Sequence, residues 1–256
     1  MTLDGHRSND FTTYVFQSSD YGKKWKSITN NLPTNQPVRT FCEDHQNNRL
    51  VFCGTEHSCY ASLDRGKSWL KLTGGLPTVP VHDLKIQDRD SELVAATHGR
   101  GVWILDIEPL RQMTRSVVRK KAMLMKPQMS YLWRRIQRTN SGHKQYRAPK
   151  APSGASIYLY LKEKPKEPPV IEISDLEGTK LASVKGKAVA GIQQIQWSTR
   201  TQVSGRRGRR PGPSVKPGTY TASFTFNGET QSEAIILKAD PMSHAKNDGS
   251  HPLMRK

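Results

Sequence analysis

The chain has 256 residues, of which 34% are apolar, and its 40 Lys and Arg against 22 Asp and Glu give a formal net charge of +18. This length holds one large domain or two small ones. No run of 18 apolar residues occurs, which excludes a helical membrane span, and residues 1–11 lack the apolar stretch of a secretory signal peptide. The positive charge suits either an anionic partner such as nucleic acid or a solvated basic surface, and we favour the second.

A sequence motif near the N-terminus occurs twice. Residues 12–17 (TTYVFQ) are expected to form a strand, and they lead into the pattern Ser-x-Asp-x-Gly-x-x-Trp at 18–25. The pattern returns at 62–69, after an expected strand at 59–62, with an offset of 44 residues. Self-similarity at this period is typical of a repeat fold, and a four-stranded propeller blade has about this length.

The residue types of the motif suit a tight hairpin turn. Serine and aspartate side chains accept backbone hydrogen bonds in turns, and glycine adopts backbone angles that other residues reach only at a cost. The tryptophan can bury its ring against the hairpin. We therefore expect the eight motif residues to be structural rather than catalytic: Ser18, Asp20, Gly22, Trp25, Ser62, Asp64, Gly66 and Trp69.

Further strands are expected between and after the two motifs. Apolar alternation or short apolar runs place them at 25–28, 38–43, 50–54, 69–72, 81–87 and 93–97. The run THGRGVWILD at 97–106 then closes the second copy without a third motif. Its His98 and Arg100 could clamp an anion, but a glycine turn with polar side chains in solvent explains them too, and we favour the turn.

The motif resembles the Asp-box (BNR) repeat, which lies on the hairpin between the third and fourth strands of a propeller blade. Residues 54–106 look like the last blades of large bacterial sortilin-like BNR-repeat proteins, which are often labelled glycosyl-hydrolase-like. The resemblance covers residues 8–108 and implies an all-β fold. It implies that residues 1–108 form about two Asp-box blades, an incomplete β-propeller whose remaining blades belong to a longer protein. Four residues depart from the family pattern: Cys53, His57, Ser58 and Cys59.

Residues 109–154 differ in kind from the repeats. Between 109 and 150 the chain holds twelve Lys or Arg and no Asp or Glu, and 109–125 can form one or two helical turns. Arginines interleaved with Tyr131, Trp133 and Tyr146 could stack on nucleic acid. The resembled family instead has a linker here that joins the propeller to a following β domain. We expect a basic linker and no nucleic-acid partner.

Residues 155–240 predict an Ig-like β-sandwich, and this segment also resembles the Ig-like domain of the flagellar hook-capping protein. The Asn227-Gly228 pair is a strong hairpin signal. The loop at 204–214 is expected to be mobile, with phosphate binding by its arginines (Arg206, Arg207, Arg209 and Arg210) as the alternative. Residues 241–256 are expected to be a disordered tail. The strands are expected at 156–162, 169–174, 179–184, 192–197, 219–226 and 229–238.

The cysteines predict neither a metal site nor a disulfide framework. Cys42, Cys53 and Cys59 are odd in number and have no zinc-ligand spacing. One bridge from Cys53 to Cys59 stays open as an alternative, but free buried thiols are the favoured interpretation. No metal and no cofactor are expected.

Two classes of function remain. We favour a non-catalytic binding or scaffold piece of a secreted or cell-envelope protein, extracellular or periplasmic, with a protein or glycan ligand. The alternative is the C-terminal part of a propeller glycoside hydrolase, sialidase- or xyloglucanase-like, whose catalytic residues lie upstream. Glycosidases use two carboxylates across a sugar cleft. The available carboxylates lie in no recognisable catalytic motif: Glu43, Asp44, Glu56, Asp83, Asp88, Asp90, Glu92 and Asp106.

Overall fold

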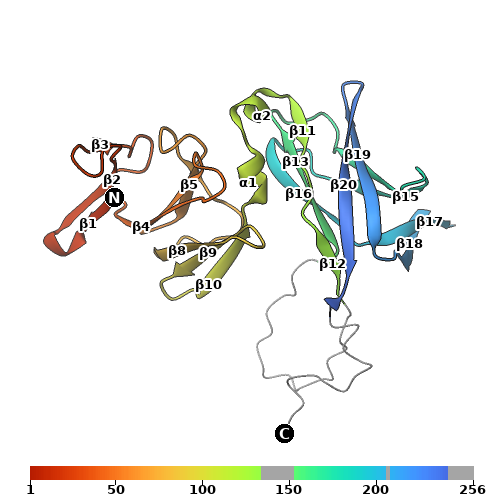
Figure 1. Ribbon diagram of the computed structural model, residues 1–256, viewed down its shortest axis with the longest axis horizontal. Coiled ribbons are helices and arrows are strands. Elements are labelled where there is room, and N and C mark those ends of the chain that lie inside the picture. Colours follow the sequence, from red (N-terminus) through yellow and green to blue (C-terminus); the bar gives the residue numbers. More distant parts are fainter. Residues whose placement is uncertain (134–152, 206–207, 242–256) are drawn as a thin grey trace, which may run out of the picture. The chain divides into compact units, whose positions relative to one another are not determined.

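The computed structural model describes residues 1–133, 153–205 and 208–241. The fold is all-β, as the sequence predicts, with two short α-helices among the strands (Figure 1). The chain separates into two compact units, Met1–Val118 and Arg119–Lys256. The predicted domain boundaries at 108, 154 and 240 stay predictions.

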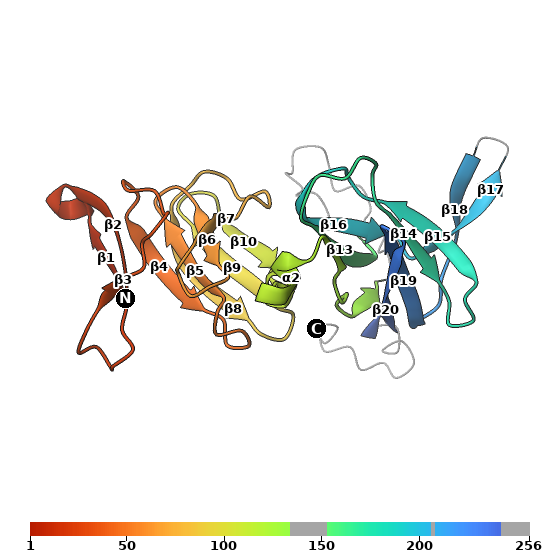
Figure 2. The same cartoon turned by 90° about the horizontal axis from the view of Figure 1, so that it is seen from above.

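The first unit consists of three antiparallel sheets that lie side by side (Figure 2). The middle sheet is a complete four-stranded blade, and each neighbour has three strands, so the expected two blades are one whole blade between two partial ones. The strands of the first sheet are β1 (Thr2–Gly5), β2 (Asp10–Gln17) and β3 (Lys26–Ser27). Those of the second are β4 (Val38–Glu43), β5 (Val51–Thr55), β6 (Cys59–Ser62) and β7 (Leu70–Lys71). Those of the third are β8 (Val81–Gln87), β9 (Glu92–Thr97) and β10 (Val102–Asp106).

Strand β1 was not expected, because only 12–17 looked like a strand in the first sixteen residues. It pairs with β2 in the register Leu3↔Tyr14, and a short 3-10 helix, η1 (His6–Ser8), turns the chain between them. The sequence of β1, TLDG, carries no apolar alternation, so its extended form depends on pairing with the longer neighbour.

Strand β5 explains how the three sheets of the first unit hold together. Its residues are buried on both faces, and alternate side chains enter different clusters. Val51 and Cys53 join the cluster shared with the first sheet, and Phe52 joins the cluster shared with the third sheet. A strand that is covered on both faces needs a continuous apolar run, which is what residues 50–54 provide.

The chain leaves the third sheet through two short helices, α1 (Glu108–Gln112) and α2 (Arg115–Arg119). Helix α1 stands where a third motif would begin, because Asp106 lies 44 residues after Ser62 and Glu108 lies 44 residues after Asp64. Proline at the second position of α1 favours a helix start. The repeat therefore ends in a helix rather than in a third hairpin.

The second unit is a β-sandwich around one core. One sheet has the order β11-β13-β16, the other has the order β12-β20-β19-β14-β15, and β17 and β18 form a separate hairpin. Both sheets contribute to the core, with Ile157 and Trp197 from the first and Ile171 and Phe224 from the second. The bounds are β11 (Ala122–Leu124), β12 (Ser130–Leu132), β13 (Ala155–Leu161), β14 (Val170–Ser174), β15 (Lys180–Lys185), β16 (Gly191–Trp197), β17 (Arg200–Gly205), β18 (Gly208–Ser214), β19 (Gly218–Phe226) and β20 (Glu229–Ala239).

Two segments of the second unit differ from expectation. The segment expected as a linker contributes β11, which pairs with β13, and β12, which pairs in parallel with β20. The described residues of the segment 204–214, expected as a mobile loop, instead form the end of β17 and the whole of β18. Its glycines and prolines suggested a loop, but the Gln202 side chain anchors β17 to the backbone of Ser183 in β15. The predicted tail, apart from Pro241, lies outside the described residues.

The predicted hairpin at Asn227-Gly228 is confirmed. It joins β19 to β20, and both residues have positive φ, +52° and +85°. A type I′ turn needs this conformation at both central positions, and asparagine followed by glycine adopts it at the lowest cost.

Candidate functional site

Each motif forms a closed network of hydrogen bonds within its own turn. In the second copy the Ser62 hydroxyl accepts from the Gly66 N–H at 2.7 Å, and Asp64 Oδ1 accepts from the Ser68 N–H at 2.8 Å. The first copy repeats this geometry, with 2.8 Å from the Gly22 N–H to Ser18 Oγ. In both copies the glycine and the residue before it have positive φ.

The Asp64 carboxylate is held in its ionised form by this turn. Partial burial raises its pKa, but hydrogen bonds from the Ser68 hydroxyl, the Ser68 N–H and the Ser62 hydroxyl outweigh burial, and the pKa lies below its ordinary value. Both carboxylate oxygens are engaged within the turn, Oδ1 by Ser62 and the Ser68 N–H and Oδ2 by the Ser68 hydroxyl. This geometry suits a structural role for the aspartate.

The second motif is also joined to the preceding sheet. The Trp69 indole N–H donates to the Ile28 carbonyl at 2.9 Å, and the Asn31 amide exchanges two 2.8 Å bonds with the Trp69 backbone. Asn30 donates to the Gly66 carbonyl. Gly66 has a φ of +79°, and a Cβ there would lie 2.7 Å from the end of the Ile28 side chain and 3.1 Å from Ile28 Cβ, so the turn favours glycine.

The tryptophans of the two motifs differ sharply in solvent exposure. Trp69 is 3% exposed and packs edge-on against Phe41, whereas Trp25 is 46% exposed. Trp69 lies against the first sheet, whereas Trp25 makes no hydrogen bond among the described residues that corresponds to those of Trp69 with Ile28 and Asn31. The same residue of the repeat is therefore covered in one copy and open in the other.

The asparagines that bond the second motif to the preceding sheet are not repeated in the next copy. The counterparts of Asn30 and Asn31, 44 residues on, are Gly74 and Gly75, which have no side-chain amide. The motif they would bond is replaced by α1. The loss of the amides therefore accompanies the loss of the partner turn.

Helix α1 makes a different attachment, a buried ion pair that sequence reasoning missed. Arg111 donates from Nε and Nη2 to the two carboxylate oxygens of Asp44, at 2.8 and 2.7 Å, and from Nη1 to the Ser91 hydroxyl at 2.7 Å. The hydrogen bonds to Asp44 raise the pKa of Arg111. Asp88, 44 residues after Asp44, lies 3.6 Å from the same guanidinium. An aspartate at the same position of both repeats was the one sign in the sequence of an acidic partner for Arg111.

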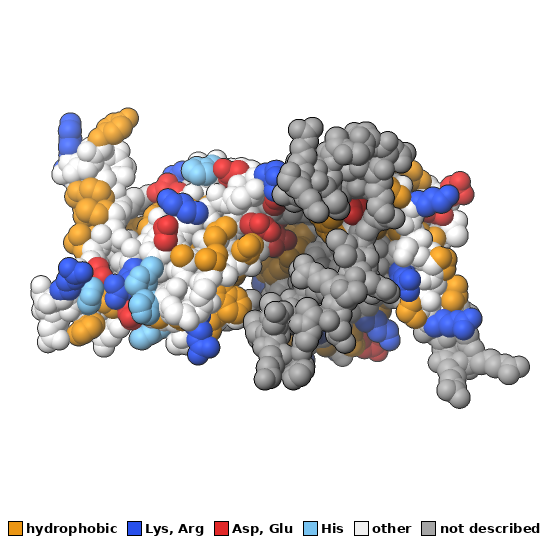
Figure 3. Space-filling view, turned by 90° about the horizontal axis from the view of Figure 1, so that it is seen from below, with side chains coloured by type: hydrophobic (Ala, Val, Ile, Leu, Met, Phe, Trp, Pro, Cys, Tyr) orange, Lys and Arg blue, Asp and Glu red, His pale blue; other side chains and the backbone are white. Residues whose placement is uncertain are grey.

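Two faces of the first unit remain open. In the first sheet the open side carries Leu3, Tyr14 and Phe16, with the two rings stacked 6.1 Å apart. In the third sheet the open side carries Val102 and Ile104 of β10, which are 64% and 61% exposed. Hydrophobic side chains are visible on the surface of the N-terminal sheet in Figure 3. Open apolar strands of this kind are typical of a surface that another element covers.

The residues proposed as anion ligands do not form one site. His98 stacks on His82, with ring centroids 5.3 Å apart, and the Arg100 carbonyl accepts from the Trp103 indole N–H. Both His98 and Arg100 are exposed. Arg206 and Arg207 lie outside the described residues, and Arg209 and Arg210 belong to β18 in the other unit.

The carboxylates available for a glycosidase are mostly engaged or exposed. Asp44 is held by Arg111, and Glu56 is paired with Arg39. Glu92 lies opposite Asp106 across β9 and β10, and burial together with the charges of Asp90 and Asp106 raises the pKa of Glu92. This pair lies on the open side of the third sheet and lines none of the cavities described below.

The three cysteines are free. Cys53 belongs to the cluster between the first and second sheets, and Cys59 to the cluster between the second and third. The two side chains therefore lie on opposite faces of one sheet, which excludes the bridge that the sequence left open. Burial raises the pKa of Cys59 to about 12 and that of Cys53 well above its ordinary value, so both are inert thiols.

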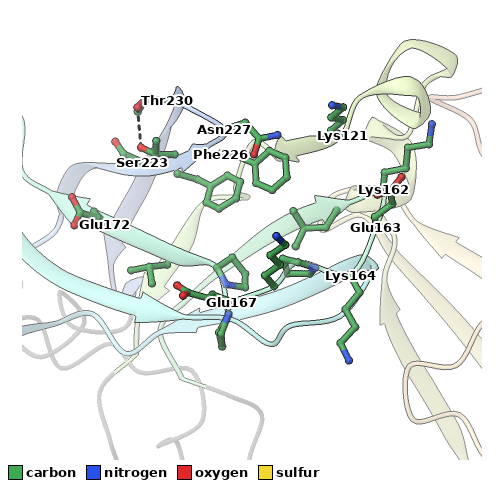
Figure 4. A pocket seen from close by; sticks show the side chains of 18 residues that line it. Lys121, Lys162, Glu163, Lys164, Glu167, Glu172, Ser223, Phe226, Asn227 and Thr230 are labelled. Carbon is green, nitrogen blue, oxygen red and sulfur yellow. Dashed lines mark hydrogen bonds between the residues drawn. The ribbon is translucent and has the colours of Figure 1, made fainter.

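The second unit carries a half-open cavity of about 1080 Å³ at one end of the sandwich. Its walls are the loop after β13 and the β19–β20 hairpin, which supplies Phe226 and Asn227 (Figure 4). The Thr225 and Thr230 hydroxyls beside it bond each other at 2.9 Å. Its charges nearly balance, because three acids accompany four lysines: Glu163, Glu167, Glu172, Lys121, Lys162, Lys164 and Lys166.

Two kinds of feature are absent from the part of the chain that the structure describes. No cluster of three or more His, Cys, Asp or Glu there could hold a metal ion. None of its helices has the length and apolar character needed to cross a bilayer.

Comparison with known proteins adds little. No family model and no curated protein matches the chain. Among solved structures, it is similar to the extracellular domains of BT4673 and BT3049 from B. thetaiotaomicron, with 11% and 9% identity and TM-scores of 0.30 and 0.29. These matches cover 89% and 88% of this chain but only 28% and 29% of those chains. A likeness this weak assigns neither a fold nor a function, and the chain spans less than a third of either structure.

Proposed function

We propose that the first unit is a non-catalytic section of a larger Asp-box propeller, in an extracellular or cell-envelope protein, where it acts as a scaffold and binding surface. The observation that supports this is the contrast between the buried Trp69 and the exposed Trp25. Trp69 shows how one sheet of the repeat covers the motif of the next. Trp25 presents the same surface without that cover.

The other end of the unit supports the same proposal. Val102 and Ile104 lie on an edge strand, and the opposite side of β10 packs through Trp103 and Leu105 onto the second sheet. A further blade laid on the open side would bury both aliphatic side chains. We propose that the following Ig-like unit is a separate binding or spacing module of the same protein.

The test compares the same residue of the repeat at two sites. Trp69→Ala should lower the free energy of unfolding of the first unit by about 3–5 kcal/mol, the usual cost of removing a buried aromatic side chain. Trp25→Ala should cost within about 0.5 kcal/mol, as surface substitutions do. Equal costs would show that Trp25 is already covered in this chain, and the proposal of an open blade would fall.

A catalytic role for this chain alone is a separate question with its own test. The purified chain should not hydrolyse aryl glycosides, sialosides or xyloglucan, because two cavities of the first unit are lined by only one carboxylate each, Glu43 and Asp64. Turnover that disappears when one of those carboxylates is changed to its amide would contradict the proposal.

A further inference from the structure

A cleft of about 640 Å³ in the first unit carries a concentration of positive charge. It lies between the end of the first sheet and the second Asp-box turn, and its size is that of a small-ligand site. Five cations and one acid line it: Lys26, Arg49, Arg65, Lys67, Arg115 and Asp64. Its walls are all present in this chain, so it does not depend on further blades.

The cations of this cleft have no carboxylate partners among the described residues. Arg49 donates to the Leu63 carbonyl at 3.2 Å and Arg65 to the Asn48 carbonyl at 2.9 Å, so backbone oxygens hold both guanidinium groups. Lys26, Lys67 and Arg115 enter none of the ion pairs of the described residues. Asp64, the one acid, is engaged within its own turn.

The net charge of +18 alone does not explain this arrangement. The larger cavity of the second unit has four lysines, but three glutamates accompany them. In the cleft five cations face one carboxylate. Clefts lined by one sign of charge concentrate the potential between their walls and attract ligands of opposite sign.

The uncharged lining indicates the kind of anion. Gln17, Asn30, Asn48 and Ser27 supply amide and hydroxyl groups, and no aromatic side chain belongs to the described lining. Proteins that bind single-stranded nucleic acid stack its bases on aromatic rings. Amides and a hydroxyl beside cations suit a chain of hydroxyl groups that carries acidic substituents.

We propose that this cleft binds an acidic polysaccharide through the sulfate or carboxylate groups on its sugars. The cations contact the acidic groups, and the amides contact ring hydroxyls. This inference goes beyond the scaffold role proposed above and is tested independently of it, since the cleft needs no additional blade. Binding should weaken as salt is added, because the contacts are exposed.

The test uses the whole chain and labelled oligosaccharides of two kinds, a heparin fragment for sulfate and an oligogalacturonate for carboxylate. Changing Lys26, Lys67 and Arg115 together to Gln should weaken binding of the preferred oligosaccharide by about tenfold or more, since exposed charge contacts contribute modestly and add. Lys26→Arg with Lys67→Arg should keep the affinity. Circular dichroism checks that each variant is folded.

A matched control removes the same charge outside the cleft. Arg7, Lys71 and Lys85 are exposed, line no part of it, and are likewise one arginine and two lysines. Changing these three to Gln should alter affinity by less than about twofold. An equal loss in the control, or failure of both oligosaccharides to bind, would overturn the proposal. A DNA oligonucleotide bound as tightly and lost in the same variant would replace the polysaccharide with nucleic acid.

Discussion

The buried ion pair of helix α1 gives a sharp energetic prediction. The Arg111 and Asp44 side chains are 5% and 0% exposed, and two hydrogen bonds of 2.7 and 2.8 Å join them. Arg111→Met removes both and leaves the carboxylate with the 3.2 Å bond from the Gln46 N–H. Breaking a buried pair from one side costs about 3–5 kcal/mol, because the remaining charge stays buried without an opposite charge. We expect that loss in the free energy of unfolding.

Replacing both Arg111 and Asp44 should lower the free energy of unfolding much less than replacing either one alone. In the double variant Arg111→Met with Asp44→Leu, no charge is left buried, and replacements of this kind are often nearly neutral. Urea unfolding of the four proteins of this cycle, followed by tryptophan fluorescence, measures the coupling. A loss below about 1 kcal/mol in Arg111→Met would refute the argument, because the pair would then be open to water.

Three other predictions follow from the geometry. Asp64→Ala should lower the free energy of unfolding by about 1–2 kcal/mol, the scale of a lost cap. Because folding lowers the pKa of Asp64, its contribution should be present above the ordinary pKa of 3.8 and disappear as pH falls below it. Urea midpoints of the native protein and the variant between pH 2 and 6 check this, and a difference between them that does not change with pH contradicts it. A thiol reagent should label at most Cys42 in the native protein and all three cysteines in denaturant, with rapid native labelling of Cys59 as the contrary result. Residues 119–241 should unfold at higher urea than 155–241, because the shorter piece lacks β11 and β12; equal midpoints would show that these strands contribute nothing.

Local signals predicted much of the architecture. Val38–Glu43, Cys59–Ser62 and Val81–Gln87 have the bounds that the sequence indicated, because each combines strand-forming residues with a turn signal on at least one side. The 44-residue offset indicated that two turns share one structure, and their hydrogen bonds do match. A repeat can be recognised in a single sequence because its two copies can be aligned with each other.

What the sequence did not predict depends on distant partners. Strand β12 has only three residues, and its extended conformation depends on pairing with β20. Arg111 sits in a segment rich in arginine, and its burial depends on Asp44, which lies 67 residues earlier. The bonds between Asn31 and Trp69 likewise join two sheets. No local pattern distinguishes these residues from exposed neighbours of the same type.

The central claim is that a neighbouring sheet covers the tryptophan of the second motif, Trp69, while the tryptophan of the first motif, Trp25, is open. Hydrogen exchange of the indole N–H groups, followed by NMR of the chain labelled with ¹⁵N-tryptophan, measures this directly. The Trp69 N–H, bonded to the Ile28 carbonyl, should be strongly protected, and the Trp25 N–H should exchange at nearly the rate of a free indole. Protection of Trp25 comparable to that of Trp69 would contradict the claim.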